Sequence, residues 1–256
     1  MILMFGICNL ANIPLRIEPS DRSELVSQVL FGEHFIVLEH TQKWSKIHLA
    51  YDDYEGWIDN KQFVTITEVQ FEQLSKDRIV LNSDLIEYIT SSGNTLTPIP
   101  LGASLTFLNY EAMNIEKFSF EGVKISGVKP KSNLINTAFM YINAPYLWGG
   151  KTPFGIDCSG FTQMVYKLNG YKLFRDASQQ ASQGEALSFI EESEPGDLAF
   201  FDNDEGNIIH VGIIMDDNYI IHASGKVRID RLDHLGIYNA EINKHTHKLR
   251  VIKKII

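Results

Sequence analysis

The sequence contains only two cysteines, Cys8 and Cys158, and they lie far apart in the chain. Two thiols cannot form a disulfide framework, so this count is typical of a reducing compartment or of a chain in which one thiol does chemistry. The sequence also lacks an apolar run near the ~18 residues of a membrane-spanning helix. Its first residues lack the basic flank, apolar region and cleavage site of a secretory signal. We therefore expect a cytoplasmic protein without a membrane span, or a secreted or periplasmic one if the native amino terminus was trimmed.

Basic residues are the scarcer charged class, with 23 Lys and Arg against 32 Asp and Glu, a net charge of −9. This balance argues against a broad phosphate-binding surface and hence against a nucleic-acid partner. The 256 residues are 44% hydrophobic and 21% charged, an ordinary globular composition whose length predicts between one and two domains. Nothing in the composition indicates an obligate protein partner.

Residues 1–66 contain short apolar runs separated by Gly, Pro and Asp, which is typical of a small β-barrel. Four runs stand out in order: Pro14-Leu15-Arg16, Leu30-Phe31-Gly32-Glu33, Trp44-Ser45-Lys46-Ile47 and Glu55-Gly56-Trp57-Ile58. This order resembles a bacterial SH3-like domain, over roughly Gly6 to Ile66. Large aromatic side chains are usually buried, so we expect Trp44 and Trp57 in the core of the barrel.

The rest of the chain divides near residue 130. Residues 67–130 mix helical and strand signals, and we interpret them as a divergent second SH3-like domain or a linker domain. In residues 131–256 the apolar spacing predicts one helix from Ser132 to about Asn143 and another from near Asp157 to before Gly170. A strand at 198–201 and a hairpin at 208–215 and 219–223 are expected to follow.

Cys158 stands where the second of these helices begins. The unpaired amides and the dipole of a helix amino terminus stabilise a thiolate, so we expect a lowered pKa and a nucleophilic sulfur. The same amides can hydrogen-bond an oxyanion that forms beside the sulfur. The alternative is a small apolar residue at a helix start.

His210 and His222 lie on the two strands of the expected hairpin. If the turn has three residues centred on Asp217, residue 212 faces 222, and His210 becomes the diagonal neighbour of His222 on one sheet face. His210 can then act as the base for Cys158 while His222 orients it. A two-residue turn would instead place the two histidines on opposite faces.

Other signals are weaker. Gly150-Lys151-Thr152 matches the end of a phosphate-binding loop, but position 145 is Pro where that loop needs Gly. The close ligand pairs of a zinc site are missing, so we expect neither a metal nor another cofactor. The stretch Lys244 to Lys254 alternates like an edge strand with solvated charges. No pattern joins the remaining histidines, which are His34, His40, His48, His234, His245 and His247.

Six motifs of the last 130 residues occur in the order seen in NlpC-type cell-wall cysteine peptidases. They are Pro145-Tyr146-Leu147-Trp148-Gly149-Gly150, Asp157-Cys158-Ser159-Gly160-Phe161, Arg175-Asp176-Ala177-Ser178-Gln179-Gln180, Pro195-Gly196-Asp197-Leu198, His210-Val211-Gly212-Ile213 and Ile221-His222-Ala223-Ser224. The resemblance covers about Asn133 to Ile256. It implies an α+β, reduced papain-like catalytic domain, with a helix packed on an antiparallel sheet.

With the SH3-like regions included, the chain resembles the γ-D-glutamyl-L-diamino acid endopeptidases, also called dipeptidyl-peptidase VI. These enzymes cut murein stem peptides between D-Glu and meso-diaminopimelate or Lys, and they require a free amino-terminal L-Ala. The resemblance implies that Cys158 is the nucleophile, His210 the base, His222 the third polar residue and Tyr146 a partner in the oxyanion hole. It also implies five substrate-binding residues, which are Asp157, Ser159, Ser178 and, for the substrate ammonium, Glu24 and Tyr54.

Two other functions fit the same motifs. SH3-like domains bind wall peptides, and NlpC-type domains sometimes lose their chemistry, so a non-catalytic peptidoglycan-binding module is one alternative. An amidase or acyltransferase on the same scaffold is the other, because fold and nucleophile do not fix the substrate. The presence of Cys158, His210 and His222 favours the peptidase.

Overall fold

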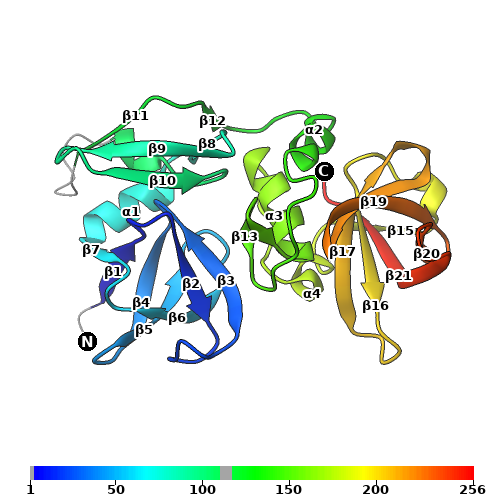
Figure 1. Cartoon of the computed structure of the whole chain (residues 1–256), viewed down its shortest axis with the longest axis horizontal. Helices are drawn as coiled ribbons and strands as arrows, with labels where there is room; N and C mark the ends of the chain where they lie inside the picture. Colours follow the sequence, from blue (N-terminus) through cyan, green and yellow to red (C-terminus); the bar gives the residue numbers. More distant parts are fainter. Residues whose placement is uncertain (1–2, 110–116) are drawn as a thin grey trace. The chain divides into compact units, whose positions relative to one another are not determined.

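The computed structural model describes residues 3–109 and 117–256, and it divides into two compact units, Met1–Gly127 and Val128–Ile256 (Figure 1). Each unit has hydrophobic clusters of its own. Among the described residues, no helix has the length and apolarity needed to cross a membrane.

The first unit begins with a seven-stranded antiparallel sheet in the order β3-β2-β6-β5-β4-β1-β7. Its strands are β1 (Met4–Ile7), β2 (Asn12–Arg16), β3 (Leu25–Leu30), β4 (His34–His40), β5 (Trp44–Leu49), β6 (Glu55–Asp59) and β7 (Val64–Ile66). Successive side chains of a strand point to opposite faces. In β5, Ile47 and Leu49 are buried, and in β6, Ile58 is buried. The expectation that Trp44 and Trp57 fill the core is therefore wrong, because the alternation turns both toward the half-buried outer face.

The remainder of the first unit packs on this sheet. Helix α1 (Glu68–Lys76) starts at a capping box in which Thr67 and Gln70 exchange side-chain and backbone hydrogen bonds. It precedes five short strands, β8 (Val80–Asn82), β9 (Ile86–Ser91), β10 (Leu96–Pro100), β11 (Phe118–Phe120) and β12 (Lys124–Ser126), and the short helix η1 (Thr106–Asn109). One apolar cluster joins residues on both sides of position 66, for example Phe31 with Ile89 and Ile99. A separate SH3-like barrel at 67–130 stays a prediction.

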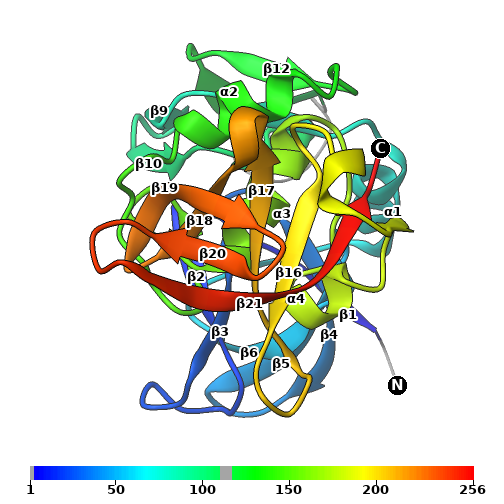
Figure 2. The same cartoon turned by 90° about the vertical axis from the view of Figure 1, so that its right-hand side faces the viewer.

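The second unit is organised around a sheet in the order β15-β21-β16-β17-β18-β19-β20. Its strands are β15 (Glu185–Leu187), β16 (Leu198–Asp202), β17 (Ile208–Met215), β18 (Tyr219–Ser224), β19 (Lys226–Asp233), β20 (Gly236–Asn239) and β21 (Lys244–Lys254). Because β21 pairs with both β16 and β20, the six strands β16 to β21 close into a ring (Figure 2). The prediction that residues 244–254 form an edge strand is therefore wrong, since β21 also pairs with β15.

The main helix of the second unit, α3 (Cys158–Leu168), packs against this sheet, and α2 (Asn133–Phe139) packs against α3. Helix α3 is buried along its whole length and packs against β17 and β18. Helix α2 stops short of the predicted Asn143, where the chain turns with a positive φ of 64°. Phe139, the last residue of α2, and Ile142, beyond its end, are both exposed, although the apolar spacing placed them on the same helical stripe as the buried Leu134 and Ala138. The hairpin of β13 (Lys151–Thr152) and β14 (Gly155–Ile156) precedes α3, and α4 (Ala177–Gln180) follows it.

Candidate active site

Cys158 is the first residue of α3, and its side chain is buried. Asp157 caps the helix, because its carboxylate accepts a hydrogen bond of 2.6 Å from the backbone N–H of Gly160. This is the predicted helix start. The first N–H groups of a helix have no partner within it, so the Cys158 amide is placed to hydrogen-bond an oxyanion that forms beside its own sulfur.

The electrostatic surroundings of Cys158 correct the expectation of a lowered pKa. Burial, together with the negative charge of Asp157, raises the pKa of the thiol to about 12. Hydrogen bonds from the backbone N–H groups of Val211 and Ser159 and the charge of Arg175 oppose this rise without cancelling it. Removal from water outweighs the helix dipole here, so the resting group is a neutral thiol.

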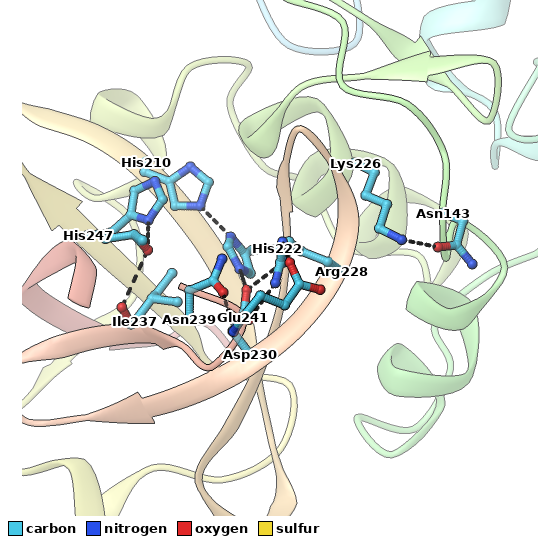
Figure 3. A network of polar contacts seen from close by, with 11 residues as sticks. Asn143, His210, His222, Lys226, Arg228, Asp230, Ile237, Asn239, Glu241 and His247 are labelled. Atoms are coloured by element: carbon cyan, nitrogen blue, oxygen red, sulfur yellow. Dashed lines mark hydrogen bonds and ion pairs between the residues drawn. The ribbon is translucent and has the colours of Figure 1, made fainter. Parts of the chain in front are cut away.

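The hydrogen bond from Val211 brings the thiol to β17, at the residue that follows His210. The turn between β17 and β18 has three residues, the short helix η3 (Asp216–Asn218), in which Asp217 takes a positive φ. Gly212 faces His222 across the hairpin, and Nε2 of His210 lies 2.8 Å from Nδ1 of His222 (Figure 3). The predicted register is confirmed. Burial lowers the pKa of His210 well below its usual value, so this imidazole is neutral and able to accept a proton.

Tyr146 lies near the thiol. Its backbone bridges to Ile156, two residues before Cys158. Burial raises the pKa of its phenol, and the negative charges that Cys158 and Asp157 carry when ionised raise it further. The backbone of Tyr146 is held by a hydrogen bond of 3.0 Å from its N–H to the carbonyl of Gly225. A phenol that stays protonated can donate a hydrogen bond, as an oxyanion hole requires.

Asp157 and Ser159, both expected to contact substrate, are held in a buried network. Arg175, which is 1% exposed, donates to Oδ2 of Asp157 at 2.6 Å and to Oδ1 at 3.0 Å. It also donates to Oγ of Ser159 at 3.0 Å. The N–H of Gly149 reaches Oδ2 of Asp157 at 2.8 Å, which ties the loop after Tyr146 to the start of α3. Asp157 therefore positions the walls of the site, and its contact with substrate stays a prediction.

The other three expected binding residues are Ser178 in the second unit and Glu24 and Tyr54 in the first. Ser178 is exposed on α4, which is anchored to α3 by Gln180 through its hydrogen bond of 2.9 Å to the carbonyl of Ser159. Glu24 and Tyr54 belong to the first unit, where Glu24 is exposed and Tyr54 half-buried. Each directly precedes one of the two strands, β3 and β6, that flank β2. Their roles toward a substrate stay predictions.

Comparison with known proteins agrees with this geometry. Residues 143–249 match the NlpC/P60 family, a stretch that contains Cys158, His210 and His222. This stretch is an NlpC/P60 domain. Residues 15–63 match the bacterial dipeptidyl-peptidase Sh3 domain. The presence of the NlpC/P60 domain and the curated relatives identify the chain as a peptidase.

Curated relatives match most of the length of the chain. The chain is 28% identical over 216 residues to the γ-D-glutamyl-L-lysine dipeptidyl-peptidase of Bacillus subtilis, covering 77% of this chain and 71% of the relative. It is 29% identical over 251 residues to dipeptidyl-peptidase 6 of Lysinibacillus sphaericus, covering 84% and 87%. The crystal structure of an NlpC/P60 family protein from Bacillus cereus superposes with a TM-score of 0.82 at 20% identity, covering 98% and 99%, and shows the shared fold.

Three residues of the NlpC/P60 domain join the site without having been expected there. His247 on β21 stacks on His210, with ring centroids 4.2 Å apart and an angle of 26° between the planes. Asp230 and Arg228 on β19 continue the contacts beyond His222 (Figure 3). His247 comes from β21, which closes the ring far along the chain, so local spacing gives no signal for it. Arg228 and Asp230 come from β19, which pairs with β18 as the next hairpin. The alternation of Arg228 and Asp230 on one face of a strand was the available hint.

Proposed function

We propose that this chain is a cysteine peptidase that cleaves the bond between γ-D-Glu and the following diamino acid of murein stem peptides with a free amino-terminal L-Ala. The observation that carries the proposal is the buried thiol of Cys158, hydrogen-bonded to the backbone of the residue after His210, together with the His210–His222 pair. It occurs in a chain with a bacterial dipeptidyl-peptidase Sh3 domain. Relatives named γ-D-glutamyl-L-lysine dipeptidyl-peptidase support the choice of bond.

The catalytic domain in this proposal is a reduced papain-like fold. Its helix is α3, which carries the nucleophile at its first residue and packs on β17 and β18. These two strands carry the base and its partner, His210 and His222. One helix and one hairpin thus bring all three groups together.

The reaction starts with a neutral Cys158 thiol and a neutral His210 imidazole. Nδ1 of His210 removes the thiol proton as the Cys158 sulfur attacks the γ-carbonyl carbon of D-Glu. The resulting oxyanion accepts hydrogen bonds from the Cys158 amide and the Tyr146 hydroxyl, each worth roughly 10²- to 10³-fold in rate by analogy with other oxyanion holes. The C–N bond then breaks, and His210 returns the proton to the leaving α-amine of the diamino acid.

The remaining acyl-enzyme is a thioester between Cys158 and the L-Ala-γ-D-Glu dipeptide. Water attacks its carbonyl while His210 takes a proton from the water. The C–S bond breaks, the dipeptide leaves with a new carboxylate, and the proton returns to the Cys158 sulfur. No metal or other cofactor takes part in this sequence.

Recognition of the substrate amine is the second part of the proposal. A carboxylate and a phenol can together hold an ammonium group, and Glu24 and Tyr54 supply these groups in the first unit. Ser178, Asp157 and Ser159 would contact the L-Ala-γ-D-Glu portion. A peptide still attached to glycan has its L-Ala nitrogen in an amide bond and cannot offer this charge. The proposed place of action therefore follows an amidase that frees the peptide, in cytoplasmic recycling of wall fragments.

The test is incubation of the full chain with L-Ala-γ-D-Glu-L-Lys and with the meso-diaminopimelate form, with products identified by mass. We expect release of L-Ala-γ-D-Glu by the wild type and none by Cys158→Ser, whose oxygen is a poor nucleophile at this site. Acetylation of the L-Ala amine removes its charge and should abolish cleavage. Equal cleavage of the acetylated peptide, or activity on intact sacculi, would overturn the proposed specificity.

A further inference from the structure

The contacts of the histidine pair extend to a buried carboxylate. Nε2 of His222 lies 3.0 Å from Oδ2 of Asp230, and both side chains are buried. Arg228 donates from Nε to the same oxygen at 2.7 Å and from Nη2 to Oδ1 at 2.9 Å. Figure 3 shows His210, His222, Asp230 and Arg228 in a continuous series that starts on β17 and ends on β19.

This series fixes the position of each proton. An ionised carboxylate only accepts hydrogen bonds, so Nε2 of His222 must carry a hydrogen. A neutral imidazole has one N–H, which leaves Nδ1 of His222 as an acceptor. Its partner at 2.8 Å, Nε2 of His210, must then be the donor. The remaining nitrogen of His210, Nδ1, is left without a proton.

The charge states on which this reasoning depends are supported by the surroundings. Burial acts to raise the pKa of Asp230, but hydrogen bonds from His222 and Arg228 outweigh it and hold that pKa below its usual value. Burial also lowers the pKa of His222, against the opposing effect of Asp230. The carboxylate is thus ionised and the imidazole neutral near pH 7.

We propose that Asp230 is a positioning residue that selects the tautomers of both His222 and His210, so that Nδ1 of His210 is free to take the thiol proton of Cys158. The inference rests on the proposed function for its kinetic consequence, and on the hydrogen-bond geometry and the charge states of Asp230 and His222 for the tautomers. Asp230 acts through two imidazoles, and it keeps the base competent before any substrate arrives. Arg228 holds the carboxylate in place with two parallel hydrogen bonds.

The first measurement is the tautomeric state of the histidines in the wild-type chain, from the ¹⁵N shifts of the ring nitrogens without substrate. We expect the Nε2–H form for both His210 and His222. The Nδ1–H form at His210 would overturn the proposal. This result depends on neither a variant nor the identity of the substrate, so it stands even if the peptide of the proposed function is not cleaved.

The second measurement compares Asp230→Asn with Asp233→Asn. Asp233 lies on the same strand and binds His245 at 2.9 Å in an exposed pair outside the site, so it is a matched control. An amide is a weaker acceptor than a carboxylate and can also donate, so in Asp230→Asn both histidines should populate the second tautomer.

We expect alkylation of Cys158 by iodoacetamide at pH 7, and kcat on the tripeptide, to fall roughly tenfold or more in Asp230→Asn with KM nearly unchanged. The Asp233→Asn chain should match the wild type in both. A purely structural role of Asp230 would lower the melting temperature while wild-type tautomers and alkylation rate remain, and that outcome would overturn the proposal. If the wild-type chain shows the expected tautomers but does not cleave the tripeptide, that result would count against the proposed substrate and leave the proposal for Asp230 standing.

Discussion

Cys158 and His210 are both withdrawn from water, and each therefore keeps its uncharged form over a wide range of pH. A resting ion pair would need the thiol to ionise below the pKa of the imidazole, whereas burial separates the two values in the opposite sense. Proton transfer from sulfur to nitrogen must accordingly be coupled to attack on the substrate. The Tyr146 hydroxyl, whose pKa is also raised by burial, remains a donor throughout this range.

This charge state predicts the pH profile. Activity requires neutral His210, and its pKa lies well below the usual 6.5, so kcat/KM should stay high as the pH falls through 6.5 and decline only below it. On the alkaline side, loss of the substrate ammonium should reduce kcat/KM above about pH 8. The measurement is kcat/KM on the tripeptide between about pH 4 and pH 9. An acid limb centred above pH 6.5 would show that His210 is solvated during turnover.

The two histidines should differ in their tolerance of substitution. His210→Ala removes the proton acceptor, and we expect kcat to fall roughly 10⁴-fold or more. His222→Gln keeps a carbonyl that can accept from Nε2 of His210, and a loss of about 10- to 100-fold is expected. Steady-state kinetics on the tripeptide, with melting temperatures as the check on folding, measures both. Equal losses would mean that the roles of base and orienting partner are wrongly assigned.

At the level of elements, one hairpin and one helix define the site. The three-residue turn at 216–218 sets the register that puts His210 diagonal to His222. Gly212, directly opposite His222, leaves the space that the imidazole needs. A Cβ atom at Gly212 would lie 2.8 Å from Cβ of His222 and 2.8 Å from Cδ1 of Ile220.

Gly212→Ala should therefore displace His222 and weaken its hydrogen bond to His210. We expect kcat to fall roughly 10- to 100-fold, since small displacements of catalytic groups have effects of this size. Gly206→Asn is the matched control, because this turn position has open space around it and asparagine tolerates its positive φ. Kinetics and melting temperature of both variants provide the test. An unchanged kcat in Gly212→Ala would show that the hairpin accommodates the methyl group.

Elements with a local signal could be predicted from the sequence, and contacts across the closed ring could not. The start of α3 at Asp157 and the register of the hairpin depend on capping and turn length, which short stretches encode. His247 reaches the site on β21, which closes the ring, and Arg175 reaches it from the loop between α3 and α4. Burial of Cys158 depends on everything packed around α3. The edge assignment of 244–254 failed for the same reason, because alternation alone does not reveal how many neighbours a strand has.

At the scale of the whole molecule, the two compact units indicate where the chain can be shortened without dividing an apolar cluster. Phe5, Ile7, Phe31 and Ile66 share one apolar cluster with residues after position 66. Deleting residues 1–66 would expose that cluster, whereas a cut between Gly127 and Val128 separates two units with their own clusters.

Residues 128–256 alone should fold, since their sheet and buried helix are complete. We expect this shortened chain to keep the Cys158 alkylation rate of the full chain and to lose cleavage of the free tripeptide, because Glu24 and Tyr54 are gone. Circular dichroism, alkylation by iodoacetamide and product mass measure these properties. If residues 128–256 cleaved the tripeptide at the rate of the full chain, the first unit would be dispensable for amine recognition. A chain of residues 67–256 should have a lower melting temperature than either the full chain or residues 128–256.

The strand that closes the ring is also the last of its six to be synthesised. Residues 198–254 take roughly 3 to 11 s to leave a ribosome that adds about 5–20 residues per second. During that interval β16 has an unpaired edge, and β20 adds a second one once it has been made. Unpaired edges of this kind can pair with other chains. His247 arrives on the same strand, so the stacked partner of His210 is missing until the edges are sealed. During synthesis an open sheet with unpaired edges therefore exists before the ring closes and the active site is complete.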